Sequence, residues 1–300
     1  MHFGIDVGGT KTEFAVFDEN FERVHSCRVS TPRDDYEQYL QTLKSLIKRG
    51  DEEFGGRNTI GVGITGVLDR QGCSLSVNVP CTNGNNVERD LAEIIGRPVR
   101  CINDVRAFAL SEAQGGAAEG FRTMVGVILG TGSASGYCLD GFPVLGINGV
   151  AGEWGHLPID VRLATEFDLP VYDCPCGLSA CQELYVSGQG LARLAEHFSG
   201  EALDSLTCVS RMRSGDAPAS RAFGVWLECV SAVVSQLVLH INPEVIVIGG
   251  GMSKIEEIYT LLPEAVSGKL LKGVPTPPIL QAKFGDDSGV RGAAIVGAQD

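Results

Sequence analysis

The chain has 300 residues, of which 44% are hydrophobic and 20% charged, so it is long enough for two globular domains. A formal net charge of −13 argues against partners such as nucleic acid or anionic membrane. The N-terminus carries no export signal pattern and no long apolar run predicts a membrane span, so we expect a cytoplasmic protein.

The first third of the chain alternates strands and helices. Two β-rich runs, 1–9 and 10–18, meet at a Gly-Gly pair typical of a tight hairpin, and a third run follows. Apolar residues at helical spacing predict a helix over 34–50, which we expect Gly50 to end. The remaining predicted elements are a strand at 60–66, a helix at 90–96, a strand at 99–104 and a helix from 104.

The pattern of the opening hairpin recurs at 123–141, where a strand is followed by a glycine turn and a second strand. A long amphipathic helix begins near residue 222, and a strand at 244–251 ends in three glycines. This alternation predicts an α/β fold, and the repeated hairpin suggests two similar halves with the functional site in the cleft between them.

Three β runs end in glycines, at 6–11, 129–136 and 248–253. Glycine lets backbone N–H groups approach phosphate oxygens and tolerates positive φ. One such run alone is typical of a hairpin turn, but three in one α/β chain indicate a phosphate or nucleotide site. None matches the P-loop pattern or the dinucleotide-binding fingerprint.

Two further features have competing interpretations. Asp104 follows a strand and opens a helix, so it is either a helix N-cap or a candidate general base. His156, Cys174, Cys176 and Cys181 form a Cys₃His set that suits tetrahedral zinc. A disulfide is disfavoured in the cytoplasm, and a thioredoxin-like redox pair needs C-x-x-C, which is absent from this stretch.

The glycine runs resemble those of the sugar kinase, actin and heat-shock ATPase superfold. "DVGGTK", "INDVRAFALSEA", "LGTG", "GEWGH", "CPCGLSACQE" and "VIVIGGG" together resemble the ROK family of bacterial sugar kinases and repressors over nearly the full length. The resemblance implies a two-domain α/β kinase with its active site in the cleft. We expect a small domain of 1–115 plus 287–300 and a large domain of 116–286 that holds the zinc.

The resemblance also implies roles for individual residues. Asp104 would be the general base, the metal would be a structural zinc held by His156, Cys174, Cys176 and Cys181, and Mg²⁺ would accompany ATP. The residues implied for the sugar are Gly66, Asn78, Asn103, Asp104, Glu153, His156 and Glu183. Those implied for ATP are Asp6, which would help hold the magnesium, Gly8, Gly9, Thr10, Lys11, Gly130, Thr131, Gly132, Gly249, Gly250 and Gly251.

Three departures from the family pattern concern the site. Arg106 stands in "NDVR" where the family usually has N-D-A-N, "SASG" follows "LGTG" in place of more glycines, and Ala180 replaces the usual glycine before the last cysteine. The residues with chemical roles are all present, so we expect an active kinase.

The choice of function and substrate depends on other segments. Only three residues precede "GIDVGGT", so the helix-turn-helix of a repressor is not expected. A non-catalytic sugar sensor would lose Asp104, which is present here. A zinc-scaffolded interaction module would not need the three glycine loops. The "NVP" loop at 76–84 and the 17-residue spacer between His156 and Cys174 resemble N-acetylglucosamine kinases. We therefore expect phosphorylation of N-acetyl-D-glucosamine at its 6-hydroxyl by a homodimer; fructose, mannose or glucose kinases of the same family are the alternatives.

Overall fold

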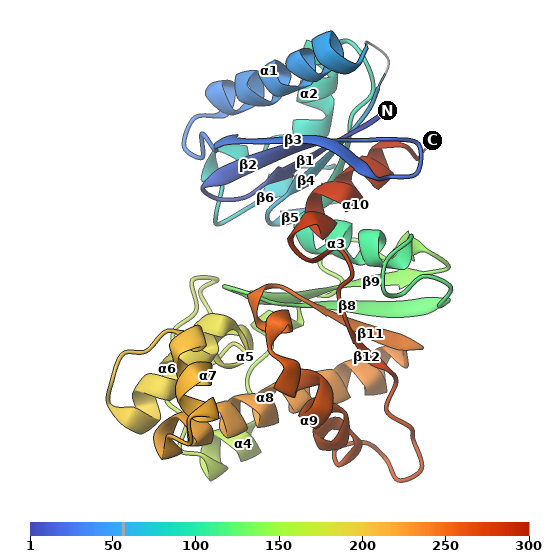
Figure 1. Cartoon of the computed structure of the whole chain (residues 1–300). Coiled ribbons are helices and arrows are strands. Elements are labelled where there is room, and N and C mark those ends of the chain that lie inside the picture. Colours follow the sequence, from blue (N-terminus) through green and yellow to red (C-terminus); the bar gives the residue numbers. More distant parts are fainter. Residues whose placement is uncertain (56–57, 300) are drawn as a thin grey trace. The chain divides into compact units, whose positions relative to one another are not determined.

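The computed structural model describes residues 1–55 and 58–299, which form two compact units (Figure 1). The first unit contains Met1–Glu119, Gly136–Ala151 and the chain from Phe284 onward. The second contains Gly120–Ser135 and Gly152–Lys283. Both units have the α/β architecture that the alternating sequence pattern predicts.

The first unit is built on a five-stranded sheet of order β3-β2-β1-β4-β7. β1 pairs antiparallel with β2 through the predicted hairpin and parallel with β4, and β4 is parallel to β7. The elements up to residue 113 are β1 (His2–Val7), β2 (Lys11–Phe17), β3 (Arg23–Ser30), α1 (Tyr36–Phe54), β4 (Thr59–Ile64), β5 (Val67–Leu68), β6 (Ser74–Leu75), η1 (Pro80–Thr82), α2 (Val87–Ile95), β7 (Arg100–Asn103) and α3 (Asp104–Ala113). The C-terminal segment adds η4 (Gly285–Asp287) and α10 (Ser288–Gly297).

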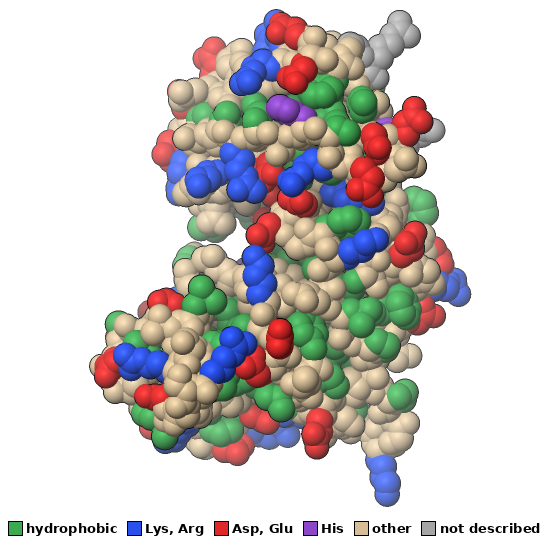
Figure 2. Space-filling view, viewed as in Figure 1, with side chains coloured by type: hydrophobic (Ala, Val, Ile, Leu, Met, Phe, Trp, Pro, Cys, Tyr) green, Lys and Arg blue, Asp and Glu red, His purple; other side chains and the backbone are tan. Residues whose placement is uncertain are grey.

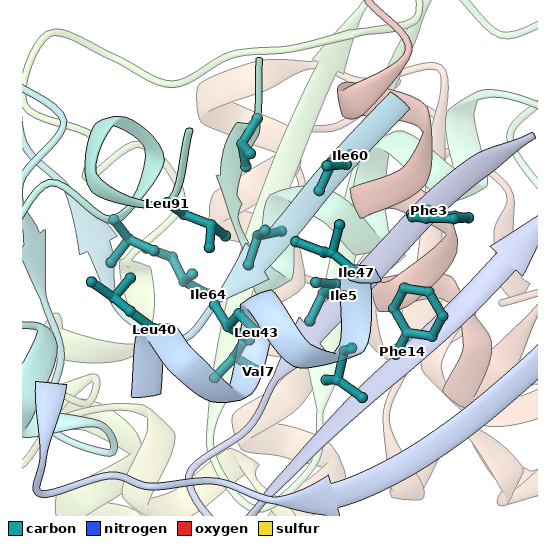
Figure 3. Packing of buried hydrophobic residues seen from close by; sticks show 14 of the residues in the cluster. Phe3, Ile5, Val7, Phe14, Leu40, Leu43, Ile47, Ile60, Ile64 and Leu91 are labelled. Atoms are coloured by element: carbon teal, nitrogen blue, oxygen red, sulfur yellow. The ribbon is translucent and has the colours of Figure 1, made fainter. Parts of the chain in front are cut away.

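Helices cover both faces of this sheet. On one face, Leu43 and Ile47 of α1 and Leu91 of α2 pack against Ile5 and Ile60 of the strands (Figure 3). On the other face, α3 and α10 pack on a second set of apolar strand residues. The strands that lead to the site are therefore held rigidly from both sides.

The prediction that Gly50 ends its helix is wrong, because α1 continues to Phe54 and its C-cap is Gly55. Gly50 lies on the buried face of α1, where an added Cβ would come 2.7 Å from the ring of Phe14 and 2.8 Å from that of Phe3. Glycine occurs here because two aromatic rings occupy the space of a side chain.

The second unit is built around the strands β8, β11 and β12 of a sheet of order β10-β9-β8-β11-β12. β11 is parallel to both β8 and β12. The elements of this part of the chain are β8 (Thr123–Leu129), β9 (Ser133–Leu139), β10 (Phe142–Pro143), η2 (Trp154–His156), α4 (Val161–Glu166), α5 (Glu183–Val186), α6 (Gly188–Ser199), α7 (Ser205–Arg213), α8 (Ala217–Ile241), β11 (Val245–Gly249), η3 (Gly251–Lys254), α9 (Glu256–Ser267) and β12 (Ile279–Gln281).

Helix α8 is long and apolar enough to cross a membrane by length and composition alone. However, 78% of its most apolar window is buried within the protein. Trp226, fully buried on this helix, donates its indole N–H to the carbonyl oxygen of Val186. We conclude that α8 is the core helix of the second unit.

Acidic and basic side chains are interspersed on the face shown in Figure 2.

The observed division differs from the expected one at residues 116–119, 136–151 and 284–286, which we expected in the large domain and which belong to the first unit. The largest of these segments is 136–151. Gly136 packs so closely on α3 that an added Cβ would come 2.8 Å from the carbonyl oxygen of Val105. From the same helix, Arg106 donates hydrogen bonds to the carbonyl oxygens of Gly149 (2.5 Å) and Ala151 (2.9 Å). The arginine that departs from the family pattern thus attaches this segment to α3.

Candidate functional site

In the first unit, the hairpin between β1 and β2 presents the first glycine run. The N–H of Gly8 bonds the carbonyl oxygen of Lys11, and the hydroxyl of Thr31 donates to the carbonyl oxygen of Gly8. Gly9, Thr10 and Lys11 are half-buried or exposed. The turn is therefore fixed by the backbone while its residues stay accessible to a ligand.

Asp6 precedes this turn, on β1. Burial, together with the nearby carboxylate of Glu13, raises the pKa of Asp6 to about 6, against the opposing effect of Arg28. A divalent cation beside Asp6 would favour its ionised form. A bound cation would therefore lower the pKa of Asp6, whose role in holding magnesium stays what the resemblance implies.

The junction between β7 and α3 brings Asn103, Asp104 and Gly66 together. The side-chain amide of Asn103 donates to the carbonyl oxygen of Gly66 (2.7 Å) and to Oδ1 of Asp104 (2.8 Å), while its oxygen accepts from the N–H of Arg106. Both N–H donors of this amide are therefore used within the chain. Gly66 has φ of +89°, and an added Cβ would come 2.2 Å from the carbonyl oxygen of Leu75, so only glycine fits.

The N-cap interpretation of Asp104 is wrong, because Asn103 caps α3 and Asp104 is its first residue. Oδ1 of Asp104 accepts the N–H of Val105 at 2.9 Å. Backbone N–H groups at a helix start stabilise an ionised carboxylate, which is the form that a general base requires. Asp104 is half-buried and so remains reachable.

Asn78 is exposed and lies against the first glycine turn. An added Cβ on Gly9 would come 3.2 Å from the Cβ of Asn78. One predicted sugar residue of the first unit, Asn78, thus neighbours its predicted phosphate turn.

In the second unit, the four predicted zinc ligands come together. One ligand atom from each of His156, Cys174, Cys176 and Cys181 lies within 4.8 Å of every other. Sγ of Cys176 is 3.6 Å from Sγ of Cys181, and Nδ1 of His156 is 3.9 Å from Sγ of Cys174. Tetrahedral zinc with Zn–S bonds of about 2.3 Å separates its sulfurs by about 3.8 Å, so the cluster fits this ion.

Glu183 connects the cysteine cluster to the second glycine run. Its Oε1 lies 3.3 Å from Sγ of Cys174 and 3.7 Å from Nδ1 of His156. An added Cβ on Gly132 would come 3.0 Å from its Oε2. Since Nδ1 of His156 faces the thiols, its Nε2 is the ring nitrogen that remains for a substrate.

The "GEWGH" segment packs on the strand that follows the second glycine run. An added Cβ on Gly155 would come 2.2 Å from the carbonyl oxygen of Ser133, and Ser135 uses both its N–H and its hydroxyl on the carbonyl oxygen of Gly152. Ser135 therefore fixes the loop that carries Glu153 and has no free donor for phosphate. The hydroxyl of Ser133 is buried and has no hydrogen-bond partner among the described residues.

Ala180, which replaces the usual glycine before the last cysteine, has φ of +57°. This left-handed conformation costs a residue with a Cβ about 1–2 kcal/mol. Hydrogen bonds with Tyr172 and Ile159 hold the backbone of Ala180 in place. The loop thus keeps its shape against the intrinsic preference of alanine.

A cavity of about 750 Å³ lies within the second unit, between α6, α7 and η3. Gly130, Thr131 and Gly251 of the predicted nucleotide loops line it. Gly250 does not, but its φ of +79° shapes the loop and an added Cβ would strike the carbonyl oxygen of Leu129. Gly249 is buried in β11. The cavity is in the size range of small-ligand pockets.

Most of the wall of this cavity, including Gln189, Ser205 and Arg213, lies outside the motifs that the sequence shows. Arg213 donates two hydrogen bonds of 2.7 Å to Glu257, which lowers the pKa of Glu257 and fixes the guanidinium plane. These residues lie on helices and turns without a motif, so no local pattern in the sequence identified them.

We expect one zinc per chain in the purified protein, and we expect Cys181→Ser to lose it because three protein ligands hold zinc more weakly than four. Elemental analysis measures the ratio, and thermal unfolding should show a lower midpoint for the variant. Cys27→Ser, outside the cluster, is the matched control and should keep its zinc. Metal-free wild-type protein of normal stability would contradict the assignment.

Comparisons with known proteins agree with this geometry. The model of the ROK family matches residues 2–299. The chain is 42% identical to the N-acetylgalactosamine kinase AgaK of Shewanella sp. (strain ANA-3), covering 99% of this chain and 96% of the relative, and 38% identical to an N-acetyl-D-glucosamine kinase of Photobacterium profundum, covering 99% of both. A crystal structure of the ROK hexokinase from Thermus thermophilus is similar with a TM-score of 0.85 at 32% identity, covering 98% of this chain and 96% of that one. The chain therefore belongs to the ROK family.

Proposed function

We propose that this ROK sugar kinase transfers the γ-phosphoryl group of ATP to the 6-hydroxyl of N-acetyl-D-glucosamine, giving N-acetyl-D-glucosamine 6-phosphate. The observation that carries the proposal is the full-length similarity, at 38–42% identity, to two kinases named for N-acetylated amino sugars. The geometry of Asp104 supports the chemical step, since it presents an accessible carboxylate.

In the proposed step, Asp104 accepts the proton of the 6-hydroxyl as the sugar oxygen attacks the γ-phosphorus and the bond to the β,γ-bridging oxygen breaks. Bound Mg²⁺ would neutralise phosphate charge, and Asp6, on the strand that leads into the first glycine turn, is the carboxylate that would help hold it. The turn at Gly9–Lys11 would donate backbone N–H groups to the phosphates, because the N–H of Gly8 is already bonded to the carbonyl oxygen of Lys11.

We place the nucleoside of ATP in the cavity of the second unit. Gly130, Thr131 and Gly251 line the cavity and connect it to the glycine loops, and Arg213 offers a fixed guanidinium plane for stacking on a base. The hydroxyl of Ser133, next to the loop, has no hydrogen-bond partner among the described residues and is a candidate phosphate donor.

Glu153, His156 and Glu183 are the proposed sugar ligands of the second unit. The zinc cluster braces Glu183 and His156 directly, and the packing of Gly155 on Ser133 braces the segment that carries Glu153. In the first unit Asn103 acts mainly by positioning Asp104 and Gly66, because both amide N–H groups are already bonded.

N-acetyl-D-galactosamine is the second candidate acceptor, favoured by the 42% identity to AgaK. The two sugars differ only in the configuration at C4, so the base, the zinc cluster and the acetamido contact would serve both. Asn78, exposed next to the first glycine turn, is a candidate hydrogen-bond partner for the acetamido group or a ring hydroxyl.

Replacing the base tests the mechanism. Asp104→Asn should lower kcat by about 10² or more while sugar binding largely survives, because the amide keeps the shape and one acceptor oxygen but takes up no proton. A coupled rate assay and calorimetry measure the two quantities. Asp35→Asn, at the N-cap of α1, is the control, since Asn caps a helix as well as Asp does. A near-normal kcat for Asp104→Asn would rule out the base.

The nucleoside assignment makes a separate prediction. Arg213→Ala should raise the KM for ATP by roughly 5- to 30-fold, the equivalent of about 1–2 kcal/mol of lost stacking, with the sugar KM little changed. Arg211→Ala is a matched control, because Arg211 lies on the same helix and pairs with Glu201 outside the cavity. Equal effects of both variants on the KM for ATP would remove the nucleoside from this cavity.

Substrate choice is measured as kcat/KM on one preparation for N-acetylglucosamine, N-acetylgalactosamine, N-acetylmannosamine, glucose, mannose and fructose. We expect N-acetylglucosamine to exceed glucose by about 10- to 10³-fold, since a polar group built to bind the acetamido loses its partner with glucose. A higher kcat/KM for N-acetylgalactosamine than for N-acetylglucosamine would make N-acetylgalactosamine the assigned acceptor. A higher kcat/KM for fructose or mannose would exclude an amino-sugar kinase.

Two further parts of the proposal concern the state of the protein. The homodimer implied by the family resemblance stays a prediction that analytical ultracentrifugation can measure. A cytoplasmic location is supported by the ten cysteines, all of which are free thiols in the structure.

A further inference from the structure

Glu112, near the C-terminal end of α3, is a fully buried carboxylate with a specific set of donors. Its Oε1 accepts the N–H of Phe284 (3.1 Å) and the hydroxyl of Ser288 (2.8 Å), and its Oε2 accepts the N–H of Ala117 (2.9 Å). A buried charge is costly without such partners. Glu112 therefore binds α3 to the segment that starts α10.

Arg291 of α10 reinforces the same contact from the other helix. Its side chain is almost fully buried, and Nη1 donates to the carbonyl oxygens of Ser111 (2.9 Å) and Gln114 (2.7 Å). The guanidinium lies 4.1 Å from the ring centre of Phe284. The helices meet so closely that an added Cβ on Gly292 would come 1.8 Å from the carbonyl oxygen of Ala107.

Both helices lead to carboxylates of the proposed reaction. α3 begins with Asp104, the proposed base. In the first turn of α10, Ser288 binds Glu112 and the next residue, Gly289, lies against Asp6, since an added Cβ there would come 3.0 Å from Oδ2 of Asp6. The α3–α10 contact thus fixes the turn that packs on Asp6 to the helix that carries Asp104.

We propose that Glu112 is a positioning residue that holds Asp6, on the magnesium side of the reaction, in register with the base Asp104. The inference rests on the proposed kinase function. Glu112 acts through α10 and not by contact with substrate. This positioning role explains why a carboxylate is buried where three hydrogen-bond donors of the same unit converge.

The proposal predicts that an isosteric amide fails. Each carboxylate oxygen of Glu112 faces at least one donor, so Glu112→Gln must turn its NH₂ group toward a donor N–H or hydroxyl. We expect kcat to fall by about 10- to 100-fold and the Mg²⁺ concentration for half-maximal rate to rise several-fold, while the sugar KM changes less than threefold.

The control separates positioning from stability. Ile47→Val trims the core on the opposite face of the same sheet and lowers stability without touching α3 or α10. The rates of all variants are normalised to folded protein by circular dichroism. Ser288→Ala removes one of the three donors and leaves the carboxylate. It should shift kcat and the Mg²⁺ dependence in the same direction as Glu112→Gln but by a smaller factor. Ser288→Ala replaces Glu112→Gln as the test variant if Glu112→Gln does not fold.

The outcomes distinguish this inference from the function on which it rests. Wild-type protein without turnover on any sugar overturns both. If the wild-type protein turns over sugar but Glu112→Gln and Ser288→Ala keep a normal Mg²⁺ dependence, the positioning role alone is overturned. The same conclusion follows if Ile47→Val loses as much kcat as Glu112→Gln. A raised Mg²⁺ requirement that occurs in Glu112→Gln and Ser288→Ala but not in Ile47→Val supports the positioning role.

Discussion

The side-chain amide of Asn103 holds the strand-to-helix junction on which the proposed chemistry of the first unit depends. One residue caps α3, fixes Oδ1 of the adjacent Asp104 and holds the carbonyl oxygen of the Gly66 turn. A buried amide with both donors used is expensive to disturb, because each lost partner leaves an unsatisfied polar group. The position of the proposed base is thus set by hydrogen bonds and not by packing alone.

The second unit uses a different device for the same purpose. The segment around Cys174, Cys176 and Cys181 has little regular secondary structure, and Ala180 holds an unfavourable backbone conformation there. A tetrahedral zinc ion held by this cluster would add order to the segment. Because Glu183 contacts the cluster and also lies against Gly132, the ion would stabilise a proposed sugar ligand and a proposed phosphate loop together.

Close backbone packing by glycine joins the Asn103 junction to the rest of the first unit. Helix α10 lies directly on β4, where an added Cβ on Gly61 would come 1.7 Å from the carbonyl oxygen of Ala293, and it meets α3 at Gly292. Such contacts leave no room for adjustment, so a small shift in one helix reaches the others. Buried Glu112 and Arg291 hold these helices in a single arrangement.

The sequence by itself determined the α/β class, the hairpins, the family and the cysteine cluster, because these depend on local periodicity, turn glycines and closely spaced ligands. It misjudged Gly50, and it missed Arg213 and Glu112. In each case the deciding partner is distant in sequence: Gly50 meets the rings of Phe3 and Phe14, Arg213 meets Glu257, and Glu112 meets Ser288. Only the tertiary structure decided these roles, because a contact between residues far apart in the chain leaves no periodic pattern in either segment.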